Sequence, residues 1–212
     1  MWELVKAGGW LMLPLVLCSI FTVAITIERF IRLKKSMILP KALLLNSAQN
    51  TEAVMQQLQQ DQALQASTLG RIFMAGYQSK NQNQQFARAQ METTASQEIG
   101  YLEKNINFLG TLSAVAPLLG LLGTVLGIIE SFLVIDLGTN SNPTLMIPGI
   151  SKALITTAAG MFIAIPALFA YRYFQRLVQE YIAELEQQST LFHAALFYQN
   201  SIDEEQDIRK AG

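Results

Sequence analysis

The feature that most constrains the fold is an apolar run with no charged residue between Lys104 and Glu130. Along this run and at Ser131 just beyond it, small or hydroxyl-bearing residues recur every three or four positions, which places them on one face of a helix. They are Ser113, Pro117, Gly120, Thr124, Gly127 and Ser131. A helix in a soluble core packs its large apolar residues, whereas membrane helices approach one another through small residues. The run therefore predicts a membrane helix with a close-packing face, or a face that borders a narrow path.

Three apolar runs are long enough to cross a membrane as helices, which need about 20 apolar residues. They cover residues 10–27, 105–135 and 148–170, and Lys152 interrupts the last one. A cleaved signal peptide is the alternative for the first run. It is disfavoured because Lys6 is the only basic residue before the run and a basic cluster follows the run. The sequence therefore predicts an all-α membrane protein with three transmembrane helices.

The basic residues predict the orientation of the spans, because Lys and Arg gather in cytoplasmic flanks. The loop predicted between the second and third spans contains no Lys or Arg. The flanks assigned to the cytoplasm carry Arg29, Arg32, Lys34, Lys35, Lys104, Arg172 and Arg176. The N-terminus is therefore expected outside the cell membrane and the C-terminus inside, in the cytoplasm.

This topology divides the chain into consecutive segments. They are a first transmembrane helix with a short periplasmic N-terminus (1–32), a cytoplasmic helical region (33–104), a second transmembrane helix (105–135), a periplasmic loop (136–147), a third transmembrane helix (148–171), and a cytoplasmic C-terminal helix and tail (172–212). Apolar residues recur at helical spacing in the cytoplasmic segments. The second and third spans are therefore expected to extend into the cytoplasm as long helices that pack on residues 41–104.

The composition argues against several classes of function. The formal net charge is -1 and only 15% of the residues are charged, so no basic excess is available to bind nucleic acid. A single cysteine, Cys18, and a single histidine, His193, cannot supply a zinc site. No phosphate-binding loop, metalloprotease motif or serine nucleophile motif occurs in the sequence. We therefore predict no enzyme activity, catalytic residue, metal or cofactor.

Four polar residues inside the later spans are candidates for a functional site, because polar side chains are costly within a bilayer. At 1.5 Å per residue, Glu130 and Lys152 each lie roughly 6–8 Å below the outer boundary, at one level. Thr124 then lies about 9 Å below Glu130, and Thr157 about 7–8 Å below Lys152. The two threonines therefore form a second polar layer, closer to the middle of the bilayer.

The charged level allows two arrangements. Glu130 and Lys152 can pair, within or between subunits, which offsets the cost of up to about 3 kcal/mol for a lone charge on insertion scales. Alternatively, both side chains can snorkel to the outer headgroups. The sequence leaves these two arrangements open.

The threonine level also has two interpretations. Thr156 shares a helix face with Lys152, whereas Thr157 lies about 140° from Lys152 around the helix. A second stripe of small residues consists of Thr157, Gly160, Ala164 and Ala167. Thr124 and Thr157 are therefore the better pair of facing residues. The alternative is that each hydroxyl bonds back to its own helix.

The later spans contain five blocks at characteristic spacing. The blocks are Ala116 to Ile129, Pro148-Gly149-Ile150, Ala153-Leu154, Thr157-Ala158-Ala159-Gly160 and Ala164-Ile165-Pro166-Ala167. Together they resemble the proton-channel family of ExbB, TolQ and the flagellar stator protein MotA, across residues 100–175. Within that family the blocks look most like ExbB, with TolQ as the alternative.

The resemblance implies a homopentamer in the bacterial inner membrane, with the second and third spans around a central pore. Two copies of a single-span partner resembling ExbD would lie in the pore, and an aspartate of this partner would carry the proton. Thr124 and Thr157 match the pore threonines of the family, so their hydroxyls would face that aspartate. Proton flow would energise a TonB-like protein, or the Tol-Pal envelope system if the chain is of the TolQ type.

One residue departs from the ExbB pattern, which has a glutamate at the position of Lys152. Lysine is normally cationic at neutral pH, so this residue is unsuited to a direct relay of protons. Glu130, at the same level, can neutralise it. A passive membrane scaffold is the alternative of a different class, and it predicts that Thr124→Ala and Thr157→Val leave function intact.

Overall fold

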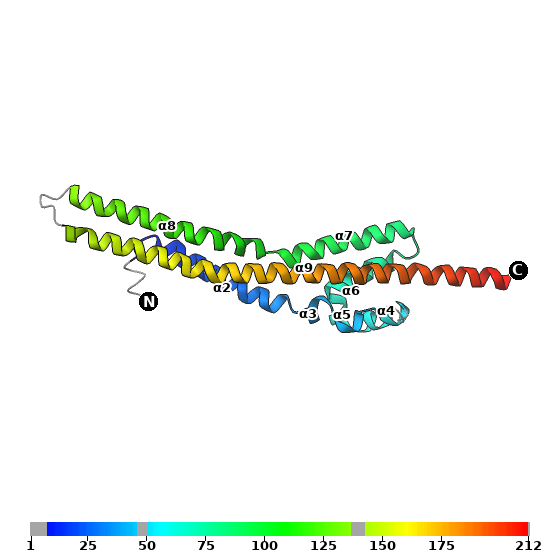
Figure 1. Ribbon diagram of the computed structural model, residues 1–212. Helices are drawn as coiled ribbons and strands as arrows, with labels where there is room; N and C mark the ends of the chain where they lie inside the picture. Colours follow the sequence, from blue (N-terminus) through cyan, green and yellow to red (C-terminus); the bar gives the residue numbers. More distant parts are fainter. Residues whose placement is uncertain (1–7, 46–50, 137–142, 212) are drawn as a thin grey trace. The chain divides into compact units, whose positions relative to one another are not determined.

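The computed structural model describes residues 8–45, 51–136 and 143–211, and the regular structure within them is helical (Figure 1). The α-helices are α2 (Met12–Arg32), α3 (Lys35–Ile38), α4 (Thr51–Gln60), α5 (Gln62–Ala66), α6 (Thr68–Gln78), α7 (Gln84–Glu103), α8 (Ile106–Asp136) and α9 (Ile147–Ala211). The described residues also contain two short 3-10 helices, η1 (Lys41–Leu43) and η2 (Pro143–Met146). The predicted all-α fold is confirmed. The predicted N-terminus before residue 8 and residues 137–142 of the predicted loop 136–147 lie outside the described residues.

The chain folds into two compact units. The first unit consists of Met1–Arg29 and Asn105–Gln175, and the second of Phe30–Lys104 and Arg176–Gly212. The first unit thus contains α8, most of α2 and the beginning of α9. The second unit contains α3 to α7 and the remainder of α9.

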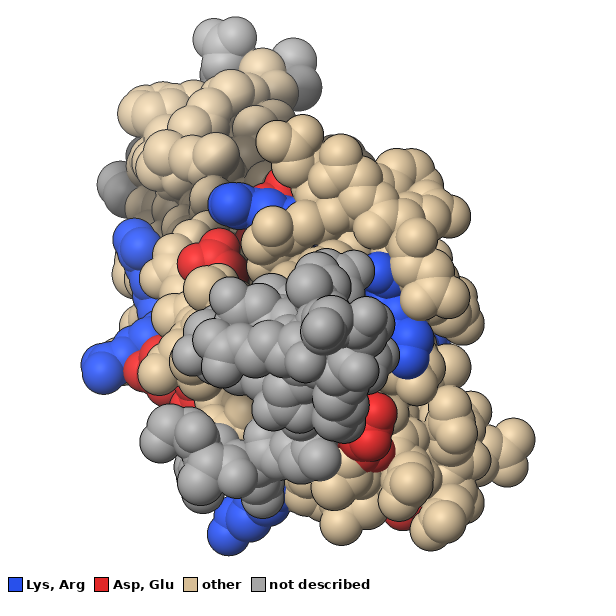
Figure 2. Space-filling model, turned by 90° about the vertical axis from the view of Figure 1, so that its right-hand side faces the viewer, with Lys and Arg blue, Asp and Glu red and all other residues tan. Residues whose placement is uncertain are grey.

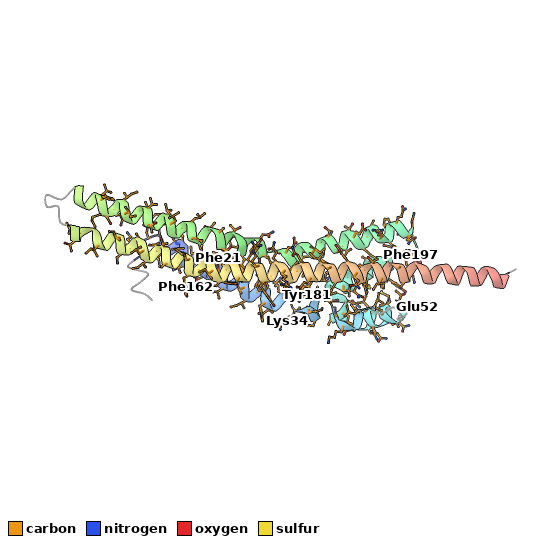
Figure 3. All side chains as sticks on the ribbon, in the orientation of Figure 1. Phe21, Lys34, Glu52, Phe162, Tyr181 and Phe197 are labelled. Atoms are coloured by element: carbon orange, nitrogen blue, oxygen red, sulfur yellow. The ribbon has the colours of Figure 1, made fainter. Side chains whose placement is uncertain are left out.

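Three stretches of the chain are long and apolar enough to cross a membrane, judged by length and composition: Met12–Arg32, Gln84–Leu133 and Thr144–Phe197. Large apolar side chains of the first unit are exposed, among them Phe21 on α2 and Phe162 on α9 (Figure 3). Phe162 is 78% exposed. A surface of this kind suits lipid or other membrane helices better than water. The protein is therefore a multi-pass membrane protein.

Small and aliphatic side chains form the buried core of the first unit. Met12 and Leu15 of α2 pack against Ala116 of α8 and Ala164 of α9. Alanine at both α8 and α9 positions keeps the two backbones near each other, as is usual between membrane helices. The core thus places the polar residues of α8 beside those of α9.

In the second unit, α9 packs on the shorter helices that precede α8. Phe192 of α9 stacks on Phe73 of α6, with ring centroids 4.1 Å apart. The Leu45 amide donates a hydrogen bond to Gln188 Oε1 at 2.8 Å, and the hydroxyl of Tyr181 donates to the carbonyl of Leu33 at 3.0 Å. The tail therefore packs on the preceding helices, as the helical spacing of its apolar residues predicted.

Side-chain caps explain where α6 and α7 begin. The Ser67 hydroxyl accepts a hydrogen bond from the Gly70 amide at 3.1 Å, and Asn83 Oδ1 accepts one from the Gln85 amide at 3.0 Å. Both are residues that satisfy the free amides of a first helical turn. The two helices are joined by Glu98 of α7, which accepts a hydrogen bond from Arg71 of α6 at 2.8 Å.

The helix of the second span differs from its prediction. We expected it to extend into the cytoplasm as one long helix, but α7 ends at Glu103 and a separate helix begins at Ile106. Asn105 lies in the break with a φ of 64°, a left-handed conformation that asparagine tolerates better than most residues. Its side chain donates a hydrogen bond to Glu28 Oε2 at 3.1 Å. The third span, by contrast, continues into the tail as one helix.

Charged side chains on the face shown in Figure 2 occur in small groups of both signs. The second unit contains ion pairs at these N–O distances: Lys35–Glu184 (2.6 Å), Arg71–Glu98 (2.8 Å), Arg88–Glu92 (2.8 Å) and Arg176–Glu180 (3.0 Å). Three of these pairs are exposed and contribute little to stability, whereas Glu98 of the pair Arg71–Glu98 is buried.

Candidate functional site

The candidate site begins with a close approach of α8 and α9 through glycine. A Cβ atom added to Gly160 would lie 2.6 Å from the carbonyl oxygen of Ala116, and one added to Gly120 would lie 3.0 Å from Thr157 Cα. These distances mean that the two backbones touch where side chains would otherwise separate them. The predicted small residues Gly120 and Gly160 thus lie at the contact.

The same contact continues toward the ends of the helices that flank the loop. A Cβ on Gly127 would lie 2.7 Å from the Gly149 carbonyl oxygen. The Ser131 hydroxyl donates to the Gly127 carbonyl at 2.8 Å and lies 3.3 Å from the carbonyl oxygen of Met146. Of the predicted stripe, Gly120, Gly127 and Ser131 are buried, whereas Ser113, Pro117 and Thr124 remain partly exposed. One part of the stripe is therefore packed against α9, and the other part is only partly covered.

Two residues that the sequence analysis did not assign to the site belong to this contact. A Cβ on Gly123 would lie 2.6 Å from Thr156 Cγ2, and the Thr156 side chain is 1% exposed. Gly123 follows Gly120 by three positions and precedes Gly127 by four. This spacing was the signal that could have identified it.

The two predicted pore threonines have different hydrogen-bond partners. Thr157 donates across the interface to the carbonyl of Gly120 at 2.8 Å. Thr124 donates to the carbonyl of Leu121 in its own helix at 2.6 Å. Thr157 therefore lies at the level of Gly120, about one helical turn from Thr124. The structure places both hydroxyls in one region without a hydrogen bond between them.

Glu130 and Lys152 lie together at the edge of this contact. Lys152 Nζ is 2.8 Å from Glu130 Oε2 and 3.1 Å from Oε1. The Lys152 side chain is 28% exposed and that of Glu130 is 50% exposed. Of the two arrangements that the sequence left open, the structure has the pair, and it forms within one chain.

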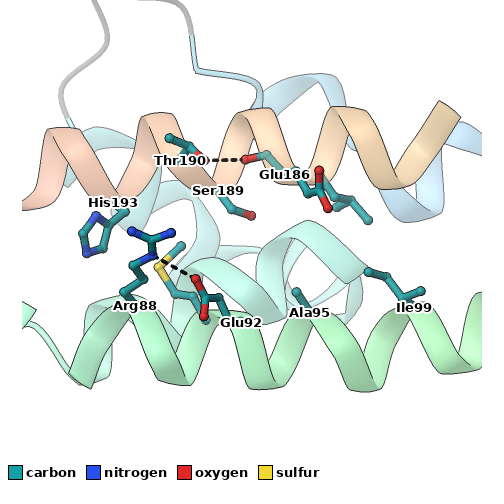
Figure 4. A pocket seen from close by; sticks show the side chains of 10 residues that line it. Arg88, Glu92, Ala95, Ile99, Glu186, Ser189, Thr190 and His193 are labelled. Atoms are coloured by element: carbon teal, nitrogen blue, oxygen red, sulfur yellow. Dashed lines mark hydrogen bonds and ion pairs between the residues drawn. The ribbon is translucent and has the colours of Figure 1, made fainter. Parts of the chain in front are cut away.

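A separate cavity of about 490 Å³ lies in the second unit, between α7 and α9 (Figure 4). Apolar side chains of Met91, Ala95 and Leu185 line it, together with polar side chains such as that of His193. His193 Nε2 lies 3.2 Å from the carbonyl oxygen of Gln84. This contact joins His193 of α9 to the first residue of α7. Among the described residues, no group of three His, Cys, Asp or Glu could hold a metal ion.

Comparison with known proteins identifies the region that contains the candidate site. The sequence model described as the MotA/TolQ/ExbB proton channel family matches residues 64–187, which include Thr124, Glu130, Lys152 and Thr157. This match covers more than half of the chain. The polar residues between α8 and α9 therefore lie within the part of the chain that the family shares.

Three relatives agree with this match. The biopolymer transport protein ExbB-like 1 of Synechocystis sp. is 35% identical over 137 residues, which are 62% of this chain and 54% of that protein. The Tol-Pal system protein TolQ of Haemophilus influenzae is 36% identical over 111 residues, 50% of this chain and 49% of that protein. ExbB-like 3 of Synechocystis sp. is 30% identical over 190 residues, 86% of this chain and 89% of that protein. The chain thus spans about half the length of the first two. It belongs to the MotA/TolQ/ExbB proton channel family and is ExbB-like.

Proposed function

We propose that this protein is a proton-conducting subunit of an inner-membrane motor that uses the proton motive force to energise transport across the outer membrane. One observation carries the proposal. Within the apolar spans of α8 and α9, Thr157 and the pair Glu130–Lys152 lie at the contact of the two helices, and Thr124 is partly exposed on α8 one residue beyond the contact residue Gly123. Polar groups grouped within membrane spans mark ion and proton pathways.

The chemistry of Thr124 suits such a pathway. Its hydroxyl proton is used in a hydrogen bond to the Leu121 carbonyl, and the side chain is partly exposed. A hydroxyl oxygen has two lone pairs, so it can still accept a hydrogen bond from a protonated carboxyl group. The donor in our proposal is an aspartate of an ExbD-like single-span partner, present in two copies within the pore.

The proposed assembly is a homopentamer in which α8 and α9 of each copy surround the pore. One copy leaves large apolar side chains of both helices exposed, including Leu121 (57%) and Ile165 (57%). In the proposed pentamer, neighbouring copies and lipid cover these side chains. The pore itself needs several copies, because two helices cannot enclose a path.

The proposed orientation places the second unit in the cytoplasm and the chain's N-terminus in the periplasm. Arg32 is the last residue of α2, Lys34 and Lys35 follow it, and Lys104 precedes α8, as the bias of basic residues toward cytoplasmic flanks requires. In this orientation the pair Glu130–Lys152 lies toward the periplasmic side. Protons moving inward would meet the pair before Thr124 and Thr157.

The proposed client is a TonB-like protein, because two of the three relatives are named as biopolymer transport proteins of the ExbB type. A TolQ-type role in the Tol-Pal system is the runner-up, supported by the relative of that name. A passive scaffold is supported by one observation, the bond from Thr157 to Gly120, since it satisfies the hydroxyl inside the chain. These functions make different predictions for threonine variants.

The test is proton flux into liposomes that contain the chain together with an ExbD-like single-span protein, the partner in our proposal. Flux is followed with an enclosed pH-sensitive dye after a membrane potential is applied. We expect Thr124→Val to lower flux by about 100-fold, the scale on which a positioned proton-transfer group acts. Thr124→Ser should retain it. A matched control is Thr111→Val, because Thr111 is exposed and also bonds back to its own helix, at 3.1 Å from the Asn107 carbonyl.

Two outcomes would contradict parts of the proposal. Equal flux for wild type and Thr124→Val would favour the scaffold. Rescue of a strain lacking the Tol-Pal motor subunit, without rescue of iron-chelate uptake in a strain lacking ExbB, would replace the TonB-like client with the Tol-Pal system.

A further inference from the structure

The N-terminal turn of the first unit lies directly on the charged pair. Gly9 has a φ of 73°, in the left-handed region that favours glycine. A Cβ added to Gly9 would collide with Lys152 Cε and would lie 2.8 Å from Lys152 Nζ. The lysine stem therefore crosses the backbone of Gly9, and a side chain at this position would push the flexible end of Lys152 aside.

The turn is anchored at both of its ends. The Met12 amide donates to the Gly9 carbonyl at 3.1 Å, and the Leu13 amide donates to the Trp10 carbonyl at 3.1 Å, which joins the turn to α2. On the other side, Thr156 Oγ1 lies 3.4 Å from the carbonyl oxygen of Gly8 and donates to the Lys152 carbonyl at 2.6 Å. Residues 8–11 thus cover the part of α9 between Lys152 and Thr156, which is about one turn of that helix.

A small hollow beneath the turn brings three elements together. The turn contributes Gly8, Trp10 and Leu11, α8 contributes Gly123, Leu126, Gly127 and Glu130, and α9 contributes Lys152 and Thr156. Thr156, which also lines the hollow, is buried. The turn therefore covers Thr156, whereas Glu130 keeps half of its side chain exposed.

The consequence for the pair is geometric. Lysine has a long flexible stem with many rotamers, and an exposed ion pair must restrict them to persist. Gly9 restricts the stem from one side and Glu130 holds the ammonium group at the other. An unpaired charge at this depth of a membrane span is costly, so the pair and the turn support each other.

We propose that the turn Gly8–Leu11 is a third wall of the candidate site and that Gly9 is a positioning residue for Lys152. Gly9 keeps the Lys152 ammonium group beside Glu130, and the turn shields the Thr156 side chain from solvent. The inference rests on the proposed proton pathway only for its effect on flux. Its structural part, which is the contact of the turn with Lys152, stands apart from any activity.

The first experiment measures shielding rather than activity. In the full chain with Cys18→Ala, a cysteine introduced by Thr156→Cys is treated with a water-soluble maleimide. We expect slow labelling with Gly9 present, and labelling at least severalfold faster after Gly9→Asn. Asparagine tolerates a positive φ, so this variant introduces a Cβ without the full backbone strain of other residues. The matched control is Gly100→Ala, because a Cβ there meets nothing within 4 Å.

The second experiment is a double-variant cycle read by proton flux in liposomes. Gly9→Asn should lower flux severalfold on the wild-type background and have no further effect on a Lys152→Ala background, where the lysine stem is absent. An equal effect on both backgrounds would overturn the proposal, since it would show backbone strain alone. Fast labelling of Thr156→Cys with Gly9 intact would also overturn it. If the wild-type protein conducts no protons, the proposed function fails while the labelling result still decides the contact.

Discussion

Thr157 Oγ1 donates a hydrogen bond to the carbonyl oxygen of Gly120 at 2.8 Å, which joins α9 to α8 within the apolar part of the first unit. The bond is short because Gly120 has no side chain to hold Thr157 away, and a Cβ there would lie 3.0 Å from Thr157 Cα. Gly120, a residue of the small-residue stripe, therefore determines the hydrogen-bond partner of Thr157. Packing and polarity are therefore coupled at this site.

Replacing Thr157 by valine should destabilise the chain by about 0.6 kcal/mol, and by at most about 1.7, the range for hydrogen bonds between membrane helices. Thr157→Ser should retain most of the stability, because the hydroxyl remains. The measurement is reversible unfolding in mixed detergent micelles, with Thr111→Val as the control. A loss as large in the control as in Thr157→Val would contradict a specific role for the bond.

Replacing Gly160 by alanine should separate α8 from α9. The new Cβ would lie 2.6 Å from the Ala116 carbonyl oxygen, and backbone cannot yield as a side chain can. We expect a loss of about 1–3 kcal/mol, typical of overpacking. Gly100→Ala, in an exposed part of α7, should leave stability unchanged or raise it slightly. Thermal unfolding followed by circular dichroism compares the two, and equal melting temperatures would refute the close contact.

Reversing the charge of Lys152 should bring two carboxylates together. Lys152 Nζ lies 2.8 Å from Glu130 Oε2, so Lys152→Glu replaces attraction by repulsion at the same level of the span. We expect a lower yield of folded protein in membranes. The exchange Glu130→Lys with Lys152→Glu should restore the yield at least in part. If the double variant gives no higher yield of folded protein than Lys152→Glu alone, the ion pair Glu130–Lys152 does not stabilise the fold.

The pair Lys35–Glu184 should make stability depend on alkaline pH. The hydrogen bond from Lys35 to Glu184, 2.6 Å long, raises the pKa of Lys35 above its ordinary value of 10.5. A pKa that is higher in the folded state contributes stability below the ordinary value and loses it as the pH rises through the folded value. The coupling between Lys35→Met and Glu184→Gln should therefore be present at pH 8 and vanish well above pH 10.5. Coupling that is unchanged at high pH would contradict the bond.

Replacing Phe192 by alanine should destabilise the second unit strongly. Phe192 is fully buried and stacks on Phe73 with ring centroids 4.1 Å apart. Removing a buried aromatic ring costs about 3–5 kcal/mol. Phe86→Ala is the control, since Phe86 is 44% exposed. Limited proteolysis of the full chain should show faster cleavage in the second unit only for Phe192→Ala.

The sequence alone determined the helical class, the apolar spans and the level at which Glu130 and Lys152 lie. These follow from local properties: the helical period places Gly120 and Gly127 on one face, and the rise per residue sets depth. The family match could also be anticipated, because the small residues and threonines of both spans occur in recognisable blocks.

Only the tertiary structure decided which atoms meet. The depth of the residues suggested that Thr124 faces Thr157, but Thr157 donates its hydrogen bond to Gly120. The Thr156 side chain packs on Gly123. The contact of Gly9 with Lys152 joins residues far apart in the sequence, so no periodicity could indicate it. The physical reason is that each helix has a local period, whereas the rotation and shift of one helix against another depend on how both surfaces pack.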